Sequence, residues 1–111
     1  MNKVFCTILL LMLPILSASV YGASCVQENN KVGFLGLDST GGGANDNGNL
    51  FVSVSGHNGG CGCNNFRFYS ANADTKAALS ILLTARMTDK VVRIDLIDST
   101  NCDSAYRVYI Q

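Results

Sequence analysis

Residues 74–90 read DTKAALSILLTARMTDK, and this stretch decides the fold. It contains neither glycine nor proline. Its apolar side chains recur at the spacing of one helical face: Ala78, Ile81, Leu82 and Ala85. The Asp74 carboxylate can accept hydrogen bonds from the free backbone N–H groups of a first helical turn. The sequence therefore predicts a helix over Asp74–Lys90 with Asp74 as its N-cap.

Segments typical of β-strands flank this helix on both sides. We expect strands over Lys31–Leu37, Leu50–Ser55, Asn64–Ser70, Val91–Ile97 and Ala105–Gln111. Three strands, a helix and two strands is the element order of the OB-fold, a small Greek-key barrel. The sequence therefore predicts a mainly β, OB-fold-like barrel of five strands, with one helix between the third and the fourth.

The segment Asp38–Asn49 reads DSTGGGANDNGN and has no large apolar side chain, so it is expected to be a surface loop. Its Asn47-Gly48 pair is typical of a hairpin turn. The oxygen-rich side chains suggest calcium as an alternative, but their spacing differs from the twelve-residue calcium loop and no glutamate closes it. Short polar side chains also suit sugar hydroxyls. The candidate glycan contacts are Asp38, Ser39, Thr40, Asn45, Asp46 and Asn47.

The N-terminus is typical of a secretory signal peptide. Lys3 supplies a positive charge, residues 4–16 are apolar, and small residues follow. The apolar run is shorter than the roughly 20 residues of a membrane-spanning helix. We expect a signal peptide over residues 1–22, with cleavage after Gly22 and cleavage after Ser19 as the alternative. The mature chain, residues 23–111, is then one exported domain, secreted or periplasmic, with no membrane span.

A lipid anchor at Cys25 is a second interpretation of the same region. The sequence Gly22-Ala23-Ser24-Cys25 resembles a lipoprotein box, which would place an acyl group on Cys25. The position three before the cysteine is normally aliphatic, and here it is Gly22. Acylation would also leave an odd thiol in the mature chain.

Removal of the leader changes the cysteine count, because Cys6 leaves with it. The four that remain, Cys25, Cys61, Cys63 and Cys102, predict two disulfides in a small exported domain. In an OB-fold barrel the starts of strands three and five are neighbours, so one of Cys61 and Cys63 should bond Cys102 and the other Cys25. A Cys61–Cys63 bond would close a strained ring. We favour Cys63–Cys102 with Cys25–Cys61.

The cysteines suggest two other chemistries. His57 with Cys61, Cys63 and Cys102 could bind zinc, and Cys61-Gly62-Cys63 could exchange disulfides as a small redox enzyme. Oxidation to structural bridges is favoured over both, because the protein is expected to be exported and the motif leads into a strand instead of a helix. His57 is then a polar turn residue, and no metal or cofactor is expected.

Composition and motifs argue against nucleic-acid binding and catalysis. After the leader the chain has seven Lys and Arg against eight Asp and Glu, so it is not basic. It has no Gly-x-Ser-x-Gly motif, and its single histidine lies in a glycine-rich turn. We therefore expect no catalytic residues. Tyr69, Tyr106 and Tyr109 could stack on sugar rings, although tryptophan is absent.

The chain resembles a known family from about Val32 to Gln111. NGGCGCNNFRFYS (58–70), ADTKAALSILLTARMTDK (73–90), VVRIDL (91–96) and the cysteine turn that follows are similar to the binding subunits of subtilase-cytotoxin-type AB toxins and to related small exported bacterial proteins. The resemblance implies an OB-fold, a ring of five subunits and binding of cell-surface glycans, often sialylated. We therefore expect a non-enzymatic, glycan-binding module. The alternative is a periplasmic or secreted protein-binding or structural module, such as an inhibitor or an envelope assembly factor.

Overall fold

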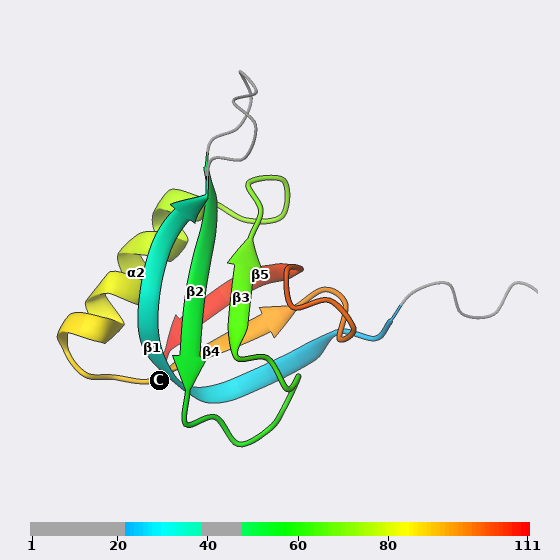
Figure 1. Cartoon of the computed structure of the whole chain (residues 1–111), viewed down its shortest axis with the longest axis horizontal. Helices are drawn as coiled ribbons and strands as arrows, with labels where there is room; N and C mark the ends of the chain where they lie inside the picture. The colour runs from blue at the N-terminus through cyan, green and yellow to red at the C-terminus, as the bar shows by residue number, and fades with distance from the viewer. Residues whose placement is uncertain (1–21, 39–47) are drawn as a thin grey trace, which may run out of the picture.

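The computed structural model describes residues 22–38 and 48–111 (Figure 1). The predicted leader, residues 1–21, and residues 39–47 of the predicted binding loop lie outside the described residues. The elements are β1 (Cys25–Asp38), β2 (Asn49–Ser55), β3 (Asn65–Phe68), α2 (Thr75–Met87), β4 (Val92–Leu96) and β5 (Ala105–Ile110). The predicted order, with the helix between the third and fourth strands, is confirmed over these residues.

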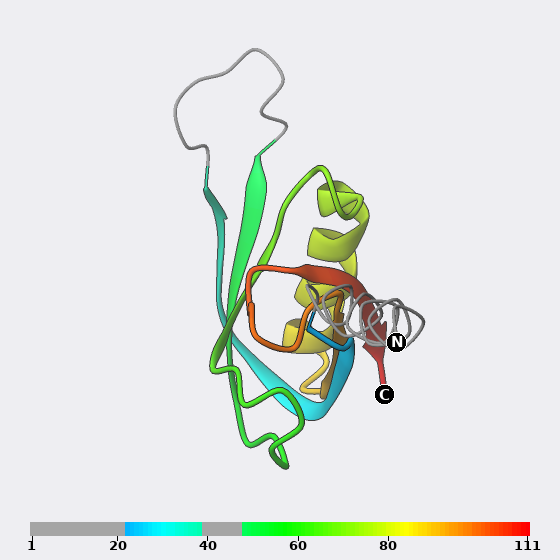
Figure 2. The ribbon, with the colours of Figure 1, turned by 90° about the vertical axis from the view of Figure 1, so that its right-hand side faces the viewer.

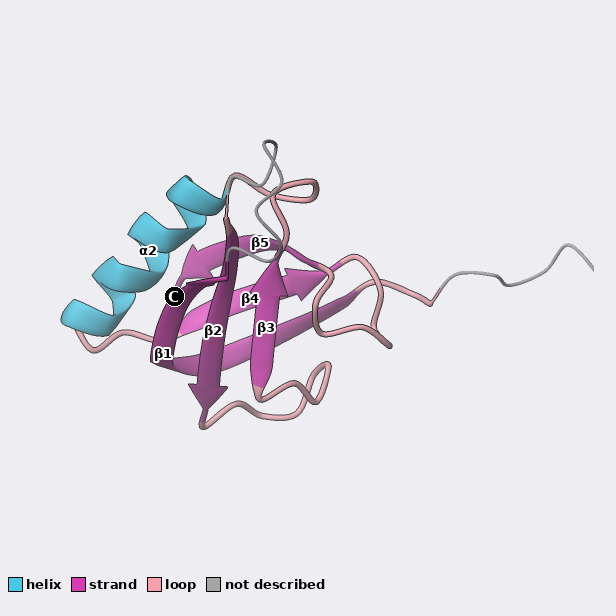
Figure 3. Ribbon diagram, turned by 45° about the horizontal axis from the view of Figure 1, so that its top comes forward, coloured by secondary structure: helices cyan, strands magenta, loops and turns pink. Residues whose placement is uncertain are grey.

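The strands form an antiparallel sheet in the order β3-β2-β1-β4-β5. The long strand β1 belongs to both halves of the sheet: residues 25–30 pair with β4, and residues 31–38 pair with β2. The register shifts between Gln27 and Asn30, where Asn29 has a φ of 60°, and shifts again between Val32 and Leu35. Bulges of this kind bend a strand, and β4 and β5 consequently cross behind β2 and β3 (Figure 3).

The prediction of a closed barrel is wrong, because the sheet does not close between its edge strands β3 and β5. Strand β3 has four residues instead of the seven expected. It ends early because the chain turns after it, with the backbone N–H groups of Asn72 and Ala73 donating to the carbonyl of Tyr69. One backbone hydrogen bond, Arg67 N to Cys102 O at 3.3 Å, joins β3 to the loop before β5. The broader prediction of a mainly β fold with five strands and one helix is confirmed for the described residues.

One apolar core lies between the rolled sheet and α2 (Figure 2). The alternation of β2, β3 and β4 explains it, because every second side chain points inward. The side chains at 0% exposure include Leu50, Val52, Phe66, Phe68, Leu82, Ile94 and Leu96. Leu82 comes from the predicted apolar face of α2, of which Ala78 and Ala85 are also buried and Ile81 is half-buried.

Both ends of α2 have identifiable causes. Asp74 is the N-cap, as predicted, and its carboxylate accepts from the backbone N–H groups of Lys76 and Ala77 at 3.1 Å each. The helix ends at Met87, short of the predicted Lys90. Asp89 has a φ of 53°, and Lys90 N donates to Ala85 O at 2.8 Å. A left-handed residue with this hydrogen bond is the Schellman type of helix end.

Candidate functional site

Two disulfides fasten the loop between β2 and β3 to the rest of the molecule. Cys25 bonds Cys61 and Cys63 bonds Cys102, which is the pairing that the sequence favours. Each cysteine of the Cys61-Gly62-Cys63 motif is therefore bonded to a distant partner, which counts against a redox pair within the motif. The bond to Cys61 also uses the Cys25 sulfur that a lipid anchor would require. The bridge and the acyl group are mutually exclusive.

His57 lies in the turn after β2 and bonds to two residues of the same loop. Its Nδ1 accepts from Gly59 N at 3.3 Å, and its Nε2 lies 3.0 Å from Asn64 Oδ1. Across residues 22–38 and 48–111, no group of three or more His, Cys, Asp or Glu side chains could hold a metal ion. Over the same ranges, no helix has the length and apolarity needed to cross a membrane.

The groove between α2 and β5 has a volume of about 250 Å³ and is open to solvent. Its lining combines aromatic, aliphatic and polar side chains: Phe68, Ala73, Asp74, Ala77, Ala78, Ile81, Tyr106, Arg107, Val108 and Tyr109. Two of the three tyrosines that could stack on sugar rings therefore line one groove. The third, Tyr69, lies in the turn after β3 and is not part of this lining. We refer to this hollow as the α2–β5 groove.

A buried carboxylate organises the rim of the groove. Asp95 is on the side of β4 opposite the core, as the alternation predicts, yet it is only 1% exposed. Arg93 donates to it from Nε at 2.9 Å and from Nη2 at 3.3 Å. Arg107 approaches from the paired position on β5, with Nε 3.2 Å from the carboxylate. The hydrogen bond to Asp95 is the largest cause that raises the pKa of Arg93.

Each arginine in turn lies over a tyrosine ring. The guanidinium carbon of Arg107 is 4.9 Å from the ring centre of Tyr106, and its Nη2 donates to the Tyr106 hydroxyl at 2.9 Å. The guanidinium carbon of Arg93 is 5.6 Å from the ring centre of Tyr109. Cation–π contacts of this kind hold both partners in place. Asp95 thus contacts both arginines, and each arginine contacts a tyrosine.

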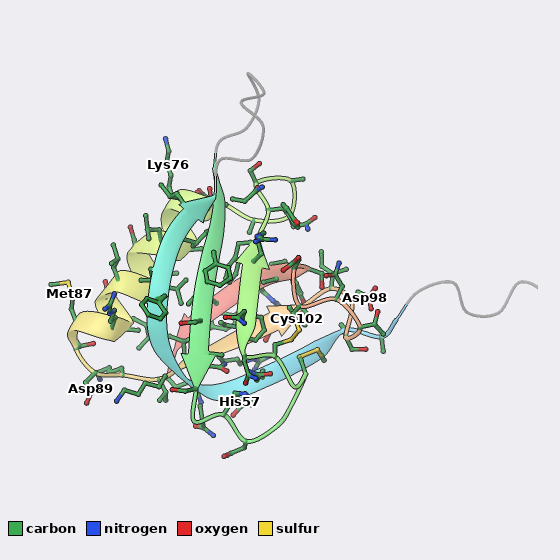
Figure 4. All side chains as sticks on the ribbon, viewed as in Figure 1. His57, Lys76, Met87, Asp89, Asp98 and Cys102 are labelled. Atoms are coloured by element: carbon green, nitrogen blue, oxygen red, sulfur yellow. A yellow bond between two sulfur atoms is a disulfide. The ribbon has the colours of Figure 1, made fainter. Side chains whose placement is uncertain are left out.

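A second hollow, of about 310 Å³, adjoins the groove at the start of α2 and shares Ala73 and Asp74 with it. Ser70, Thr75 and Lys76 complete its lining. Lys76 projects from the first turn of α2 at one end of the molecule (Figure 4). The two hollows together make a depression longer than either alone, with hydroxyl, carboxylate and ammonium groups along it.

The predicted binding loop begins and ends beside this second hollow. Ser70 N donates to Asn49 Oδ1 at 3.3 Å, and Asn49 pairs with Asp38 at the tips of β2 and β1. Five candidate glycan contacts lie outside the described residues: Ser39, Thr40, Asn45, Asp46 and Asn47. Asp38 is described only as the last residue of β1. The prediction that this loop contacts glycans is therefore not tested, and Asp74, Arg93, Asp95 and Arg107, which lie at or near the groove, were not among the predicted binding residues.

Exposed apolar side chains lie on both faces of the second half of β1: Phe34 on the outer face of the sheet, and Leu37 on the face that carries Leu50. Phe34 is 77% exposed and Leu37 is 63% exposed. The neighbouring strand β2 contributes Phe51, whose ring centre is 5.9 Å from the guanidinium carbon of Arg67 on β3. A contiguous exposed apolar patch can mark a protein interface.

Comparison with protein-family models, with curated proteins and with solved structures finds no match to this chain.

Proposed function

We propose that this chain is an exported, non-enzymatic module that binds glycans in the α2–β5 groove, in the manner of a toxin binding subunit. The observation that carries the proposal is the presence of Tyr106 and Tyr109 in one open groove with Arg107 and Asp74. Sugar recognition combines an apolar ring face with hydrogen-bonding groups at fixed positions. Tyr109 is 45% exposed and supplies the ring face. Asp74 and Arg107 supply an acceptor and a donor.

The order of the strands supports an OB-fold as the underlying architecture. An OB-fold barrel opened between strands three and five has the order 3-2-1-4-5, and these two edges run in the same direction. The Cys63–Cys102 bridge and the ion pair between Arg67 Nη1 and Asp103 Oδ2, at 3.3 Å, tie the β3 edge to the loop before β5. We infer that this chain is an OB-fold in which side chains and a disulfide replace the last hydrogen-bonded ladder.

Two further features of the molecule support export and assembly as parts of the same proposal. Both disulfides require an oxidising compartment to form and persist, and export behind the predicted leader provides one. Strands β3 and β5 each have a strand neighbour on one side only among the described residues. Edge strands can pair with another chain, and we propose a ring of five copies.

Glycan-array binding of the mature protein, residues 23–111 with both bridges formed, tests the proposal. We expect binding to cell-surface glycans, and a loss of about tenfold in affinity when Tyr109→Ser removes the exposed ring. Phe34→Ser is the matched control, because it removes an exposed ring from a different surface. The absence of binding to every sialylated and neutral glycan on the array would overturn the proposal.

The alternative function is protein binding without glycans, as in an inhibitor or an envelope assembly factor. The exposed ring of Phe34, on the same outer face of the sheet as Phe51, favours it, because exposed apolar patches can mark protein interfaces. Size-exclusion chromatography with light scattering distinguishes the two functions. A stable ring of five supports the toxin-like module, and a monomer supports the alternative.

A further inference from the structure

The first described residues of the chain are fastened to the loop between β4 and β5. Ser99 N donates to the carbonyl of Ala23 at 2.7 Å, just before β1 begins. Gly22 lies against the side chain of Asp98. A Cβ atom placed on Gly22 would be 3.0 Å from Asp98 Cγ and 3.5 Å from Thr100 Cγ2, and it would collide with Asp98 Oδ1. Figure 4 shows Asp98 beside the start of β1.

Asp98 is held in a fixed, ionised state at this position. Its Oδ1 accepts from Thr100 N at 2.9 Å and from Thr100 Oγ1 at 2.7 Å. Both hydrogen bonds lower the pKa of Asp98, and the one from the Thr100 hydroxyl has the larger effect. Ser104 fixes the backbone of Asp98, donating to its carbonyl and accepting from its N–H at 3.0 Å each. The other acidic residue of the loop, Asp103, pairs with Arg67.

The position of Gly22 next to this carboxylate has a consequence for the processed chain. Cleavage of the peptide bond after Gly22 by water leaves a carboxylate on the departing leader and a new α-ammonium group on Ala23. The nitrogen of Ala23 is bonded to the carbonyl carbon of Gly22, and the Cα of Gly22 lies against Asp98. Since the Ala23 carbonyl stays bonded to Ser99, the new charge is held close to the carboxylate and has an opposite charge to pair with.

We propose that signal-peptide cleavage after Gly22 creates the ion pair between the Ala23 α-ammonium and the Asp98 carboxylate, which fastens the start of β1 to the β4–β5 loop. This inference rests on the export part of the proposed function and is independent of glycan binding. Glycine at residue 22 suits both roles: the peptidase needs a small residue there, and a Cβ atom would displace the Asp98 carboxylate from its present position. Cleavage after Ser19 would place the ammonium three residues from this site.

The first test determines where the chain starts. The full chain is exported from a bacterial host and the intact mass of the product is measured without reduction. We expect a product that begins at Ala23 and carries two disulfides. A product that begins at Val20 overturns the inference, although it leaves glycan binding untouched. A negative glycan array with a product beginning at Ala23 overturns the glycan proposal and leaves the ion pair untouched.

The second test measures the ion pair itself. The Ala23 methyl signal is followed by NMR through the titration of the α-ammonium, whose pKa is ordinarily about 7.7–8.0. A neighbouring carboxylate stabilises the charged form, so we expect a pKa above that range, which Asp98→Asn returns to it. An ordinary pKa in the unaltered protein, or one that Asp98→Asn does not move, contradicts the inference.

The third test does not require the Asp98→Asn variant to fold. Chains that start at Ala23 and at Val20, both with Asp98 intact, are compared by urea unfolding. We expect the Val20 start to raise the unfolding equilibrium constant by up to about fivefold, the usual scale for a solvent-accessible ion pair. If the two chains unfold identically and the α-ammonium of Ala23 titrates normally, the pair does not form.

Discussion

At the scale of single residues, the Gln27 side chain forms two hydrogen bonds with the backbone of Cys63, as a neighbouring strand would. Its Oε1 accepts from Cys63 N at 2.9 Å, and its Nε2 donates to Cys63 O at 2.7 Å. Asn30 supports it, because Asn30 Oδ1 accepts from Gln27 Nε2 at 2.6 Å. Both amides are fully buried. They position the loop that carries both disulfides against β1.

Replacing this amide should be costly. Gln27→Leu keeps the size of the side chain but leaves the backbone N–H and carbonyl of Cys63 without these partners in a buried place. We expect a loss of about 2–3 kcal/mol in the free energy of unfolding, measured in urea. Glu28→Gln, a change at the exposed neighbouring position, should stay within about 0.5 kcal/mol. Equal losses in the two variants would show that the Gln27 bonds are not what holds the loop.

Local sequence patterns do not reveal these residues. CVQENN, residues 25–30, has a polar composition typical of a turn. In the folded chain, the side-chain amides of Gln27 and Asn30 donate to the carbonyls of Cys63 and Val92, which are distant in the sequence. Asp95 is a similar case. Alternation places it correctly on the side of β4 away from the core, but its burial depends on Arg107 across the strand pair. A sequence pattern shows which face a side chain is on and not what covers it.

At the scale of elements, the helix was the most predictable part of the molecule, because its causes are local. The spacing of its apolar residues and the cap at Asp74 depend on neighbours within four positions. The strands were less predictable at their ends. Strand β1 begins six residues before the expected Lys31, and β3 ends at Phe68, two residues before the expected Ser70. Where a strand ends depends on its partner strand as well as on its own sequence.

The N-cap offers a prediction at this scale. Asp74→Ala removes the acceptor for the N–H groups of Lys76 and Ala77, and we expect it to lower the free energy of unfolding by about 1 kcal/mol. Asp74→Asn keeps a capping oxygen and should stay within a few tenths of a kcal/mol of the unaltered protein. Thermal or urea unfolding measures both. If Asp74→Asn destabilised as much as alanine, the charge of Asp74 and not its capping bonds would explain the effect.

At the scale of the whole molecule, the two disulfides compensate for a sheet that does not close. They cross sequence separations of 36 and 39 residues, so their loops are nearly equal in size. In the chain-entropy model each loop closure stabilises the fold by about 4 kcal/mol. A difference between the two bridges must therefore come from the folded state. Cys63 is 1% exposed and its bridge to Cys102 ties the β3 edge to the loop before β5.

We expect the two bridges to differ in their effect on stability. Cys63→Ser with Cys102→Ser places a hydroxyl in the core and releases the β3 edge, so it should lower the free energy of unfolding by more than the roughly 4 kcal/mol of loop closure. Cys25→Ser with Cys61→Ser removes a bridge between half-buried residues and should cost about that amount or less. Urea unfolding of the two double variants measures the difference, and the reverse ranking would contradict it.

The central claim, that the α2–β5 groove binds a glycan, is tested most directly by an NMR titration. The isotope-labelled mature protein is titrated with the strongest glycan from the array, and backbone amide shifts are followed. We predict saturable shifts that are largest at Asp74, Tyr106, Arg107 and Tyr109, and their loss in Tyr109→Ser. Shifts confined to the surface around Phe34, or no saturable shifts at all, would contradict the claim.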